Sequence, residues 1–530
     1  MDIYLVFVVI LFALAASDLV VGVSNDAVNF LNSSIGSKVG KRWLIMIVAS
    51  AGILLGVLLS SGMMEVARKG IFNPSYFSFS QVMVIFMAVM MTDILLLDLF
   101  NTFGLPTSTT VSIVFELLGA AVVVSIFHLV QTGQDLSALA EYINTSKATL
   151  IIAGIFLSII VAFSVGLIAQ FGSRMLFSFN YEKMLKKYGA FWGALAMSIL
   201  GFFIINKGLK GASFATPDLI NWIQSHSWVI MGGNFILWAA ILKVIQNFTK
   251  FNILRFIVLS GTFSLALAFA SNDLVNFIGV PIAGFQSYNS WTGTESIPSQ
   301  FMMDSLSGAV STPTYLLLIA GVIMITTLWT SKKARTVSAT ELNLARQGEG
   351  KERFKPLWIA KVIVKLNITV GDWIYSKLPN NLKKRIEKNY KRSTKSFDPD
   401  APQFDLVRAA VNLTMASMII VLATSYKLPL STTYVSFMVA MGTSLADRAW
   451  GRESAVQRVS GVINVIGGWF MTALIAFSVS GIFALIILKF EVAGVLCIFA
   501  LLGITIFYTF RIHSKKSQTQ ESAPGSTAIG

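Results

Sequence analysis

Two short polar motifs, each present twice, hold most of the residues that could do chemistry in this sequence. Ser24–Phe30 reads SNDAVNF and returns as SNDLVNF at Ser271–Phe277. Leu105–Thr110 reads LPTSTT and returns as LPLSTT at Leu428–Thr433. Both motifs border apolar stretches and keep the same order in both copies, which chance does not readily explain. The repetition indicates two related halves that each carry polar groups into an apolar interior.

The motif with proline followed by Ser-Thr-Thr is typical of a helix start. Proline cannot continue a preceding helix but suits the first turn of a new one, and Ser and Thr are preferred N-caps. Free amides, the positive end of the helix dipole and three hydroxyls would bind an anion without Lys or Arg. Two facing copies would surround a tetrahedral oxyanion with donors. The alternative is that these hydroxyls bond only to backbone carbonyls or between helices.

The Ser-Asn-Asp motif supplies oxygen atoms of another kind. A carboxylate in an apolar stretch is costly without a partner, so Asp26 and Asp273 are functional candidates. Carboxylate, amide and unwound backbone oxygens suit Na⁺ or a relayed proton, and we expect a helix break at each copy. In the alternative reading, these side chains cap the break and bind no ion. The candidate ligands of a coupling cation are Asn25, Asp26, Asn29, Asn272, Asp273 and Asn276.

The composition places these motifs in a membrane. Hydrophobic residues make up 55% of the 530, charged residues 13%, and the mean hydropathy is +0.71. A soluble chain has roughly a quarter of its residues charged, so a soluble enzyme, a disordered chain and a disulfide scaffold are excluded. One cysteine and three histidines leave little for a metal centre. No Walker loop, HExxH or Gly-x-Ser-x-Gly motif occurs, so we expect no enzyme and no cofactor, with Na⁺ as the one candidate bound ion.

Apolar windows long enough for a bilayer predict about 12 membrane-spanning helices. We therefore expect an all-α polytopic membrane protein. The candidate spans are 3–23, 43–62, 80–100, 108–130, 148–171, 189–206, 228–245, 253–271, 309–330, 405–426, 432–446, 461–489 and 491–510.

Most of the net charge of +15 lies in one segment. Residues 332–404 contain 17 Lys and Arg against 7 Asp and Glu, a net +10. Such an excess beside membrane spans predicts a cytoplasmic loop and argues against nucleic acid as a partner. Within it, Pro356–Lys377 carries apolar and basic positions at helical spacing. This stretch is either an interfacial helix on the membrane surface or a solvated helical linker.

The spacing of the repeated motifs indicates that this loop is an insertion into the second copy. The first motif recurs after 247 residues and the second after 323, a difference of 76 that is close to the length of the basic segment. About seven candidate spans separate Asn25 from Asn272, and an odd number turns the second copy over. We therefore expect two inverted repeats with broken helices and re-entrant hairpins, an architecture typical of secondary transporters.

At these motifs the chain resembles the inorganic phosphate transporter (PiT) family. The family's Asn-Asp motifs are matched by Asn25, Asp26 and Asn29 and again by the second copy of these residues. Its later motifs are matched by both Ser-Thr-Thr triplets. Glu65, followed by Arg68, Lys69 and Gly70, resembles a glutamate that the family uses in transport. The likeness spans roughly 1–130 and 250–480. Departures are Ser24 and Ser271 in place of alanine, Val111 and Tyr434 in place of histidine, and no acid near Asn412.

The resemblance implies import of phosphate by symport with Na⁺ or H⁺ and alternating access. A sulfate permease of the same fold is the first alternative, because some members carry sulfate, and a receptor or scaffold that transports nothing is the second. The implied phosphate ligands are Ser108, Thr109, Thr110, Ser431, Thr432, Thr433, Asp26 and Asp273. The expected location is the plasma (inner) membrane, with loop 332–404 in the cytoplasm; expected partners are phosphate, Na⁺ or H⁺ and lipid, with a second copy of the chain as a candidate.

These expectations divide the chain into six parts. They are a first transmembrane repeat at 1–171, connecting helices at 172–252, the first part of the second repeat at 253–331, the basic loop at 332–404, the rest of the second repeat at 405–510, and a polar tail at 511–530.

Overall fold

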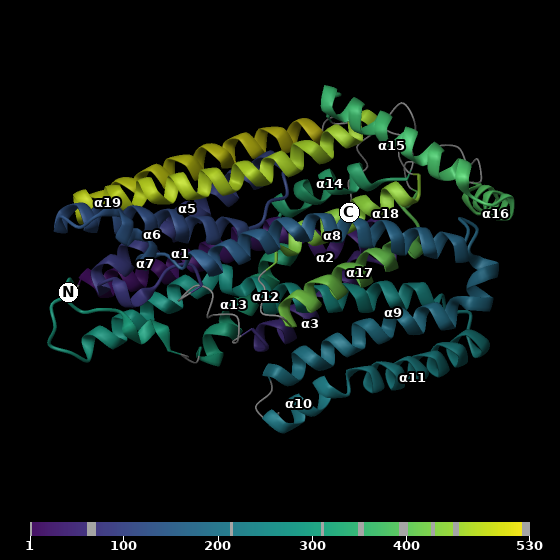
Figure 1. The fold of residues 1–530 in the computed structure, drawn as a ribbon, viewed down its shortest axis with the longest axis horizontal. Helices are drawn as coiled ribbons and strands as arrows, with labels where there is room; N and C mark the ends of the chain where they lie inside the picture. Colours follow the sequence, from purple (N-terminus) through teal and green to yellow (C-terminus); the bar gives the residue numbers. More distant parts are fainter. Residues whose placement is uncertain are drawn as a thin grey trace.

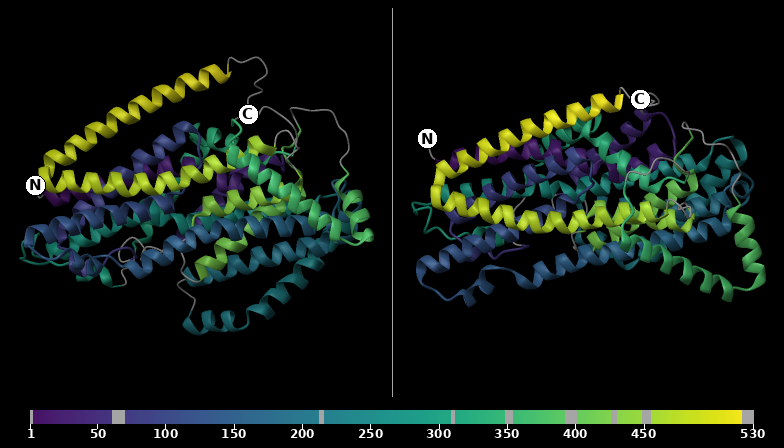
Figure 2. Two further views of the ribbon diagram at one scale, coloured as in Figure 1. Left: turned by 45° about the horizontal axis from the view of Figure 1, so that its top comes forward. Right: turned by 90° about the horizontal axis from the view of Figure 1, so that it is seen from above.

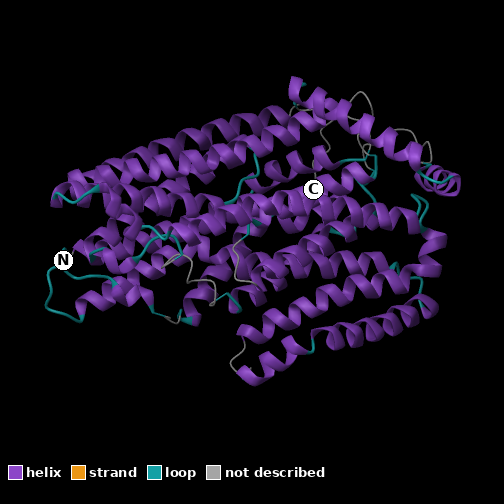
Figure 3. Cartoon of the chain, in the orientation of Figure 1, coloured by secondary structure: helices purple, strands orange, loops and turns teal. Residues whose placement is uncertain are grey.

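The structure is a bundle of long helices that run side by side along the longest axis of the molecule (Figure 1). It is a computed structural model that describes residues 3–60, 70–211, 216–308, 312–347, 354–391, 401–425, 430–448 and 455–521. Nearly all of these residues are helical, and they contain no strand beyond two isolated bridges (Figure 3). The all-α prediction is confirmed.

Eighteen α-helices and three short 3₁₀ turns make up the described chain. The helices are α1 (Ile3–Asp26), α2 (Val28–Gly36), α3 (Arg42–Leu58), α5 (Phe79–Phe103), α6 (Thr109–Thr132), α7 (Leu139–Tyr142), α8 (Thr145–Leu176), α9 (Glu182–Gly211), α10 (Pro217–Ser225), α11 (Ser227–Phe248), α12 (Ile253–Thr292), α13 (Thr314–Thr330), α14 (Lys333–Ala345), α15 (Trp358–Lys377), α16 (Asn380–Tyr390), α17 (Leu406–Ser425), α18 (Thr432–Ala446) and α19 (Ala455–Glu521). The 3₁₀ turns are η2 (Pro74–Tyr76), η3 (Leu136–Ala138) and η4 (Asp304–Ser307).

Every predicted span overlaps a helix of the described chain, and the number of about 12 membrane-spanning helices stays a prediction. Among the described residues, eight helices are long and apolar enough to cross a membrane, and α3 and α13 are shorter apolar helices. The two last predicted spans form the two arms of α19, which turns back on itself at Glu491, where φ is 48°. Figure 2 shows these arms as an elongated hairpin along one side of the bundle.

The predicted ends of two spans were wrong. Segments 3–23 and 253–271 were expected to stop before the Asn-Asp motifs, but α12 continues to Thr292, and α1 and α2 form one apolar helical segment over Ile3–Gly36. Ala27, between α1 and α2, keeps helical dihedrals and donates its amide to Val23 O at 2.9 Å. The expected unwinding at both motifs is therefore absent. Polar partners from other helices surround the motif side chains, so the helices need not end there.

The two halves exchange packing partners. Helix α6 lies along α19, and α18 lies along α8. Gly119 in α6 and Gly442 in α18 stand 323 residues apart, the spacing of the second repeated motif. A Cβ at Gly119 would collide with the carbonyl oxygen of Phe477, and one at Gly442 with that of Phe163. These glycines let the backbones of the paired helices touch, as small residues do in membrane bundles.

The start of the basic segment belongs to the bundle. Helix α14 packs against α1, α2, α5 and α18, and its Val337 and Leu344 are buried. Thr340 Oγ1 donates to Gly104 O at 2.7 Å, which joins α14 to the turn after α5. The remainder, α15 and α16, lies at one end of the bundle (Figure 1). The described part of this segment therefore consists of one helix packed into the bundle, α14, and a peripheral pair, α15 and α16.

Candidate functional site

Two helical hairpins, α5–α6 and α17–α18, carry the Ser-Thr-Thr triplets into the centre of the bundle. In the first, Gly104 ends α5 with φ 65°, in the left-handed region that glycine adopts readily. Ser108 then caps α6 by accepting the amide of Val111 at 3.1 Å. In the second, Ser431 caps α18 by accepting the amide of Tyr434 at 3.1 Å. The predicted helix starts are confirmed, and both serine hydroxyls are engaged as N-caps.

The two aspartates join these hairpins. Asp26 accepts hydrogen bonds from Thr109 Oγ1 at 3.0 Å and from Thr433 Oγ1 at 3.1 Å. Asp273 accepts one from Thr110 Oγ1 at 3.3 Å and one from Thr432 Oγ1. Each carboxylate is therefore bound to one hydroxyl of each hairpin. This arrangement is the same for both halves of the chain.

The second asparagine of each motif completes the pattern. Asn29 Nδ2 donates to Thr433 Oγ1 at 3.0 Å, and its Oδ1 accepts from Ser436 Oγ at 3.0 Å. Asn276 Nδ2 donates to Thr110 Oγ1 at 3.0 Å and to Thr109 Oγ1 at 3.2 Å. Each asparagine thus reaches the hairpin of the other half. The structure brings together the four threonines, the two aspartates and these two asparagines from regions up to 407 residues apart.

The first asparagine of each motif contacts the hairpin backbone. Asn25 Oδ1 accepts the amide of Thr107 at 2.9 Å, and its Nδ2 donates to Leu105 O at 3.2 Å. Asn272 Nδ2 donates to Leu430 O at 3.3 Å. These contacts fix each loop just before its Ser-Thr-Thr triplet. Asn101, which the sequence reading missed, supports Asn25 by accepting its Nδ2 at 2.7 Å.

The centre of the site is fully enclosed and rich in hydroxyl groups. Asp26 and Asp273 have no exposed surface, and Thr109, Thr110, Thr432 and Thr433 are each buried. None of the hydrogen-bond partners described for these six side chains is Lys, Arg or His. The site therefore offers neutral donors and two carboxylates, which suit an oxyanion and a hard cation respectively.

A single tryptophan in α19 contacts both hairpins. Trp469 Nε1 donates to Pro106 O at 3.1 Å, and its ring stacks on Tyr434 with centroids 3.9 Å apart. Both rings are fully buried. Tyr434 occupies the place of the histidine in the motif that the chain resembles, and its large ring supports the hairpin by packing. Sequence reading missed Trp469, because an aromatic residue in an apolar span carries no distinguishing local signal.

A group of three buried acids lies beside the hairpins. Asp93 of α5 lies against Asp18 of α1 and Glu116 of α6. Ser112 Oγ donates to Glu116 Oε1 at 2.6 Å. Sequence reading missed Asp18. The sequence signal for Asp18 is its position two turns before Asp26, which puts both side chains on the same face of α1.

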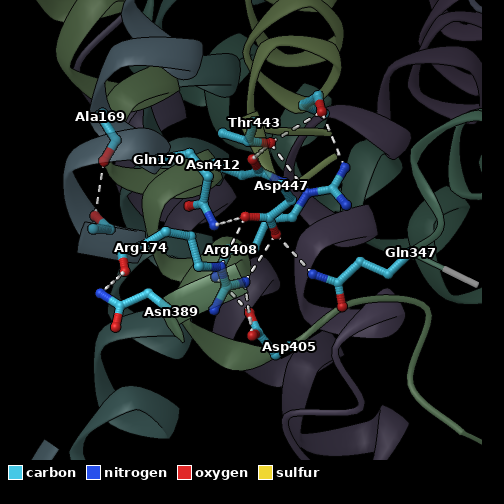
Figure 4. Close-up of polar contacts among 12 residues, drawn as sticks. Ala169, Gln170, Arg174, Gln347, Asn389, Asp405, Arg408, Asn412, Thr443 and Asp447 are labelled. Atoms are coloured by element: carbon cyan, nitrogen blue, oxygen red, sulfur yellow. Dashed lines mark hydrogen bonds and ion pairs between the residues drawn. The ribbon is translucent and has the colours of Figure 1, made fainter. Parts of the chain in front are cut away.

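A polar network surrounds Arg174 and Asp447 (Figure 4). Arg174 of α8 forms ion pairs with Asp447 at 2.8 Å and with Asp405 at 2.7 Å. Gln347, which follows α14, donates to Asp447 Oδ2 at 2.7 Å. Burial favours the neutral acid, but the hydrogen bonds and charge of Arg174 outweigh it and lower the pKa of Asp447. The network ties the inserted segment to α8, α17 and α18.

One predicted residue cannot be placed. Glu65 lies outside the described residues, together with Arg68 and Lys69 of the same motif. Among the described residues, no group of three or more His, Cys, Asp or Glu side chains has an arrangement that could hold a metal ion. A coupling cation near Asp26 and Asp273 would therefore need hydroxyl or amide oxygens as further ligands.

Comparison with known proteins gives one consistent result. The model of the phosphate transporter family matches residues 22–480. A protein of Pyrococcus abyssi named "Putative phosphate permease" is 26% identical over 262 residues, which are 49% of this chain and 62% of that protein. One of Thermococcus kodakarensis with the same name is 25% identical over 268 residues, again 49% of this chain and 62% of that protein. The match thus spans less than two thirds of these relatives.

A solved structure, "The sodium-dependent phosphate transporter", shares the fold. It aligns with a TM-score of 0.61 and 16% identity over 92% of this chain and 100% of its own. That identity supports a common fold alone. The helices, the fold and the family match make this chain a multi-pass membrane protein and no enzyme. Because the family model covers both copies of both motifs, the chain belongs to the phosphate transporter family.

Proposed function

We propose that the chain is a secondary active transporter that imports inorganic phosphate together with Na⁺ or H⁺ by alternating access. The observation that carries this proposal is the crossed hydrogen bonding of Asp26 and Asp273, each of which accepts from one threonine of each hairpin. A single ligand at this point would contact both halves of the chain. Movement of one half against the other would then change the side from which the ligand is reached.

The donors around the aspartates suit a tetrahedral oxyanion. The hydroxyls of four threonines and the Nδ2 groups of Asn29 and Asn276 converge there, and α6 and α18 both begin at the same place. Helix N-termini favour negative charge through their free amides and their dipole. The carboxylates of Asp26 and Asp273 accept these hydroxyl donors. Phosphate would take over these donors and leave the carboxylates for a cation or for its own proton.

The cation would balance charge. Two buried carboxylates and a phosphate ion would bring several negative charges into a medium of low dielectric constant, which is very costly unless cations or protons enter with them. Asp26 and Asp273 are the residues best placed to bind them, with Asn25, Asn29, Asn272 and Asn276 as the proposed neighbours. Coupling then follows, because the anion binds well only when the cation is present. Both Na⁺ and H⁺ satisfy this requirement.

The carboxylates favour phosphate over sulfate. Near neutral pH phosphate carries at least one proton, so it can donate a hydrogen bond to Asp26 or Asp273 while it accepts from the threonines. Sulfate has no proton at this pH, and an ionised carboxylate can only accept. Sulfate in the same place would face an acceptor without a donor. We therefore propose phosphate as the substrate and keep sulfate as the competitor to be tested.

Uptake into proteoliposomes tests the proposal. Labelled phosphate should accumulate against its gradient when an inward Na⁺ or H⁺ gradient is applied, and excess sulfate should compete poorly. Absence of concentrative uptake under both gradients would disprove symport. Uptake that sulfate abolishes, and that excess phosphate leaves unchanged, would identify a sulfate permease instead.

Matched variants test the site. Asp26→Asn and Asp273→Asn should remove coupled uptake, and Thr109→Val and Thr432→Val should weaken phosphate binding. Thr326→Val is the control for the threonines, because the exposed Thr326 hydroxyl bonds only to Val322 O of its own helix, at 2.8 Å. Asp304→Asn, at an exposed turn, is the control for the aspartates. Normal transport by all four site variants would make the assignment of these residues wrong.

The remaining alternative is a receptor or scaffold that works through its basic segment. It predicts that deletion of α15 and α16 abolishes function while the site variants stay active. The crossed contacts of the two hairpins favour transport, since a scaffold has no use for a buried site shared between two halves. The same set of variants, assayed with and without residues 358–390, separates the two functions.

A further inference from the structure

One helix at the end of the bundle turns a broad apolar face away from the protein. In α15, Trp358, Leu366 and Trp373 are 73%, 61% and 64% exposed, and Val362 between them is also exposed. Steps of four and seven residues place these side chains on one face of the helix. Ala360, on the other side, is the one fully buried residue of α15. An apolar stripe with two tryptophans is therefore left without a partner in the described chain.

Both ends of this helical segment are attached to helices that cross the membrane. Just before α15, the amide of Leu357 donates to Ser460 Oγ of α19 at 2.8 Å. In α16, Asn389 Nδ2 donates to Met175 O at 3.0 Å and Arg385 Nη2 donates to the same oxygen at 3.2 Å, at the last turn of α8. Figures 1 and 2 show α15 running obliquely between these two anchors at one end of the bundle. The anchors hold it beside the last turn of α8 and the start of α19, both of which are candidate membrane spans.

The surroundings of the stripe are strongly basic. Residues 354–391 contain nine Lys and Arg against two acids, Asp372 and Glu387. Lys361 and Lys365 are exposed on the face of α15 next to the stripe. The other basic residues are Lys355, Lys377, Lys383, Lys384, Arg385, Lys388 and Lys391. A helix with a tryptophan-bearing apolar face bordered by lysines has the chemistry of a helix that lies in a membrane interface.

We propose that α15 lies in the interface of the leaflet on its side of the membrane and binds anionic phospholipid. The stripe enters the upper part of the acyl chains, while Lys361, Lys365 and the basic residues of α16 contact the headgroups. The neighbouring surface of α8 supports lipid as the occupant of the stripe. Near the same end of α8, Ile168 and Phe171 are exposed apolar residues of a membrane-crossing helix. Negatively charged lipid headgroups complement the positive charge of these lysines and of α16. This electrostatic attraction fades beyond a Debye length from the membrane surface.

The single cysteine of the chain makes a direct test possible. In full-length protein with Cys497→Ser, one spin label is placed at Leu366→Cys on the stripe or at Asp372→Cys on the basic side. The protein is placed in nanodiscs of phosphatidylcholine alone or with phosphatidylglycerol. For the Leu366 label, the ratio of collision with oxygen to collision with a water-soluble nickel complex should rise several-fold when phosphatidylglycerol is present. The Asp372 label should stay accessible to nickel.

Charge reversal provides the matched control. Lys361→Glu with Lys365→Glu should return the Leu366 label to nickel accessibility, whereas Lys186→Glu with Lys187→Glu, the same change at exposed positions of α9, should not. A Leu366 label open to nickel in both lipid mixtures would overturn the proposal. A second result would also overturn it: a Leu366 label that is shielded from nickel equally in both mixtures and lies at a sharply defined distance from the label of another copy. A second copy of the chain would then cover the stripe.

Discussion

Asn29 Nδ2 donates a 3.0 Å hydrogen bond to Thr433 Oγ1, across 404 residues of sequence. Asn276 makes the equivalent contact with Thr110 Oγ1, also at 3.0 Å. In both cases the asparagine of one half reaches the hairpin of the other. The two halves therefore meet through matched hydrogen bonds, and neither half forms the site alone.

Loss of either asparagine should weaken phosphate binding to a similar extent. Asn29→Ala and Asn276→Ala each remove donors to the threonines, and a net hydrogen bond is worth about 1 kcal/mol, so KM for uptake should rise roughly tenfold or less in each. The measurement is initial uptake over a range of phosphate concentrations. Asn367→Ala is the control, because Asn367 bonds only to Ile363 O of its own helix. A large effect in one variant and none in the other would contradict the equivalence of the halves.

Removal of Arg174 should strongly destabilise the protein. Arg174→Gln would remove the ion pairs of Arg174 with the buried carboxylate of Asp447 and with the partly exposed carboxylate of Asp405, and breaking a buried pair typically costs about 3–5 kcal/mol. The thermal unfolding midpoint in detergent should fall by several degrees. Adding Asp447→Asn should recover part of the loss by removing the negative charge that Arg174 balances. If the double variant were no more stable than the single one, the ion pair would not account for the effect.

Stability should depend on pH through Glu341. Burial raises the pKa of this carboxyl in α14 to about 7. A raised pKa means that the folded state holds the proton more tightly than the unfolded state. The stabilisation is complete below about pH 4.5, declines as pH rises and is lost above pH 7.

Glu341→Gln should remove this dependence. The variant should melt at a higher temperature than the parent protein at pH 8, where the buried glutamate is ionised, and at nearly the same temperature at pH 5. The readout is the difference in midpoint between the two proteins at each pH. Glu387→Gln, at an exposed position of α16, is the control. An unchanged difference between pH 5 and pH 8 would show that Glu341 does not carry the effect.

Enlarging the contact glycines should separate the paired helices. In an exposed helix, Gly→Ala stabilises by about 1 kcal/mol, and Gly154→Ala in α8, with open space around it, should show this gain. At Gly119 and Gly442 the added Cβ meets a backbone carbonyl of the neighbouring helix, and such overpacking typically costs about 1–3 kcal/mol. Unfolding midpoints should therefore rise for the first variant and fall for the other two. Equal shifts in all three would contradict close contact.

The spans and the hairpin starts were accessible from the sequence because their causes are local. Apolar windows of about 20 residues predicted the helices, and proline followed by Ser-Thr-Thr predicted the caps at Ser108 and Ser431. The span ends at the Asn-Asp motifs were wrong for a related reason. A local pattern registers polar residues as a break, but it does not register the hydroxyls from distant helices that let α12 continue past Asp273.

The sequence by itself determined an all-helical membrane protein with two matched halves, together with the residue types that face its centre. Repetition and hydropathy carry that information along the chain. Only the tertiary structure decided which partners meet: that Asp26 contacts both hairpins, that Arg174 pairs with Asp447, and that α14 is part of the bundle. The physical reason is that a buried polar group must find its partners wherever packing places them. Here packing places Thr433, a partner of Asp26, 407 residues away in the chain.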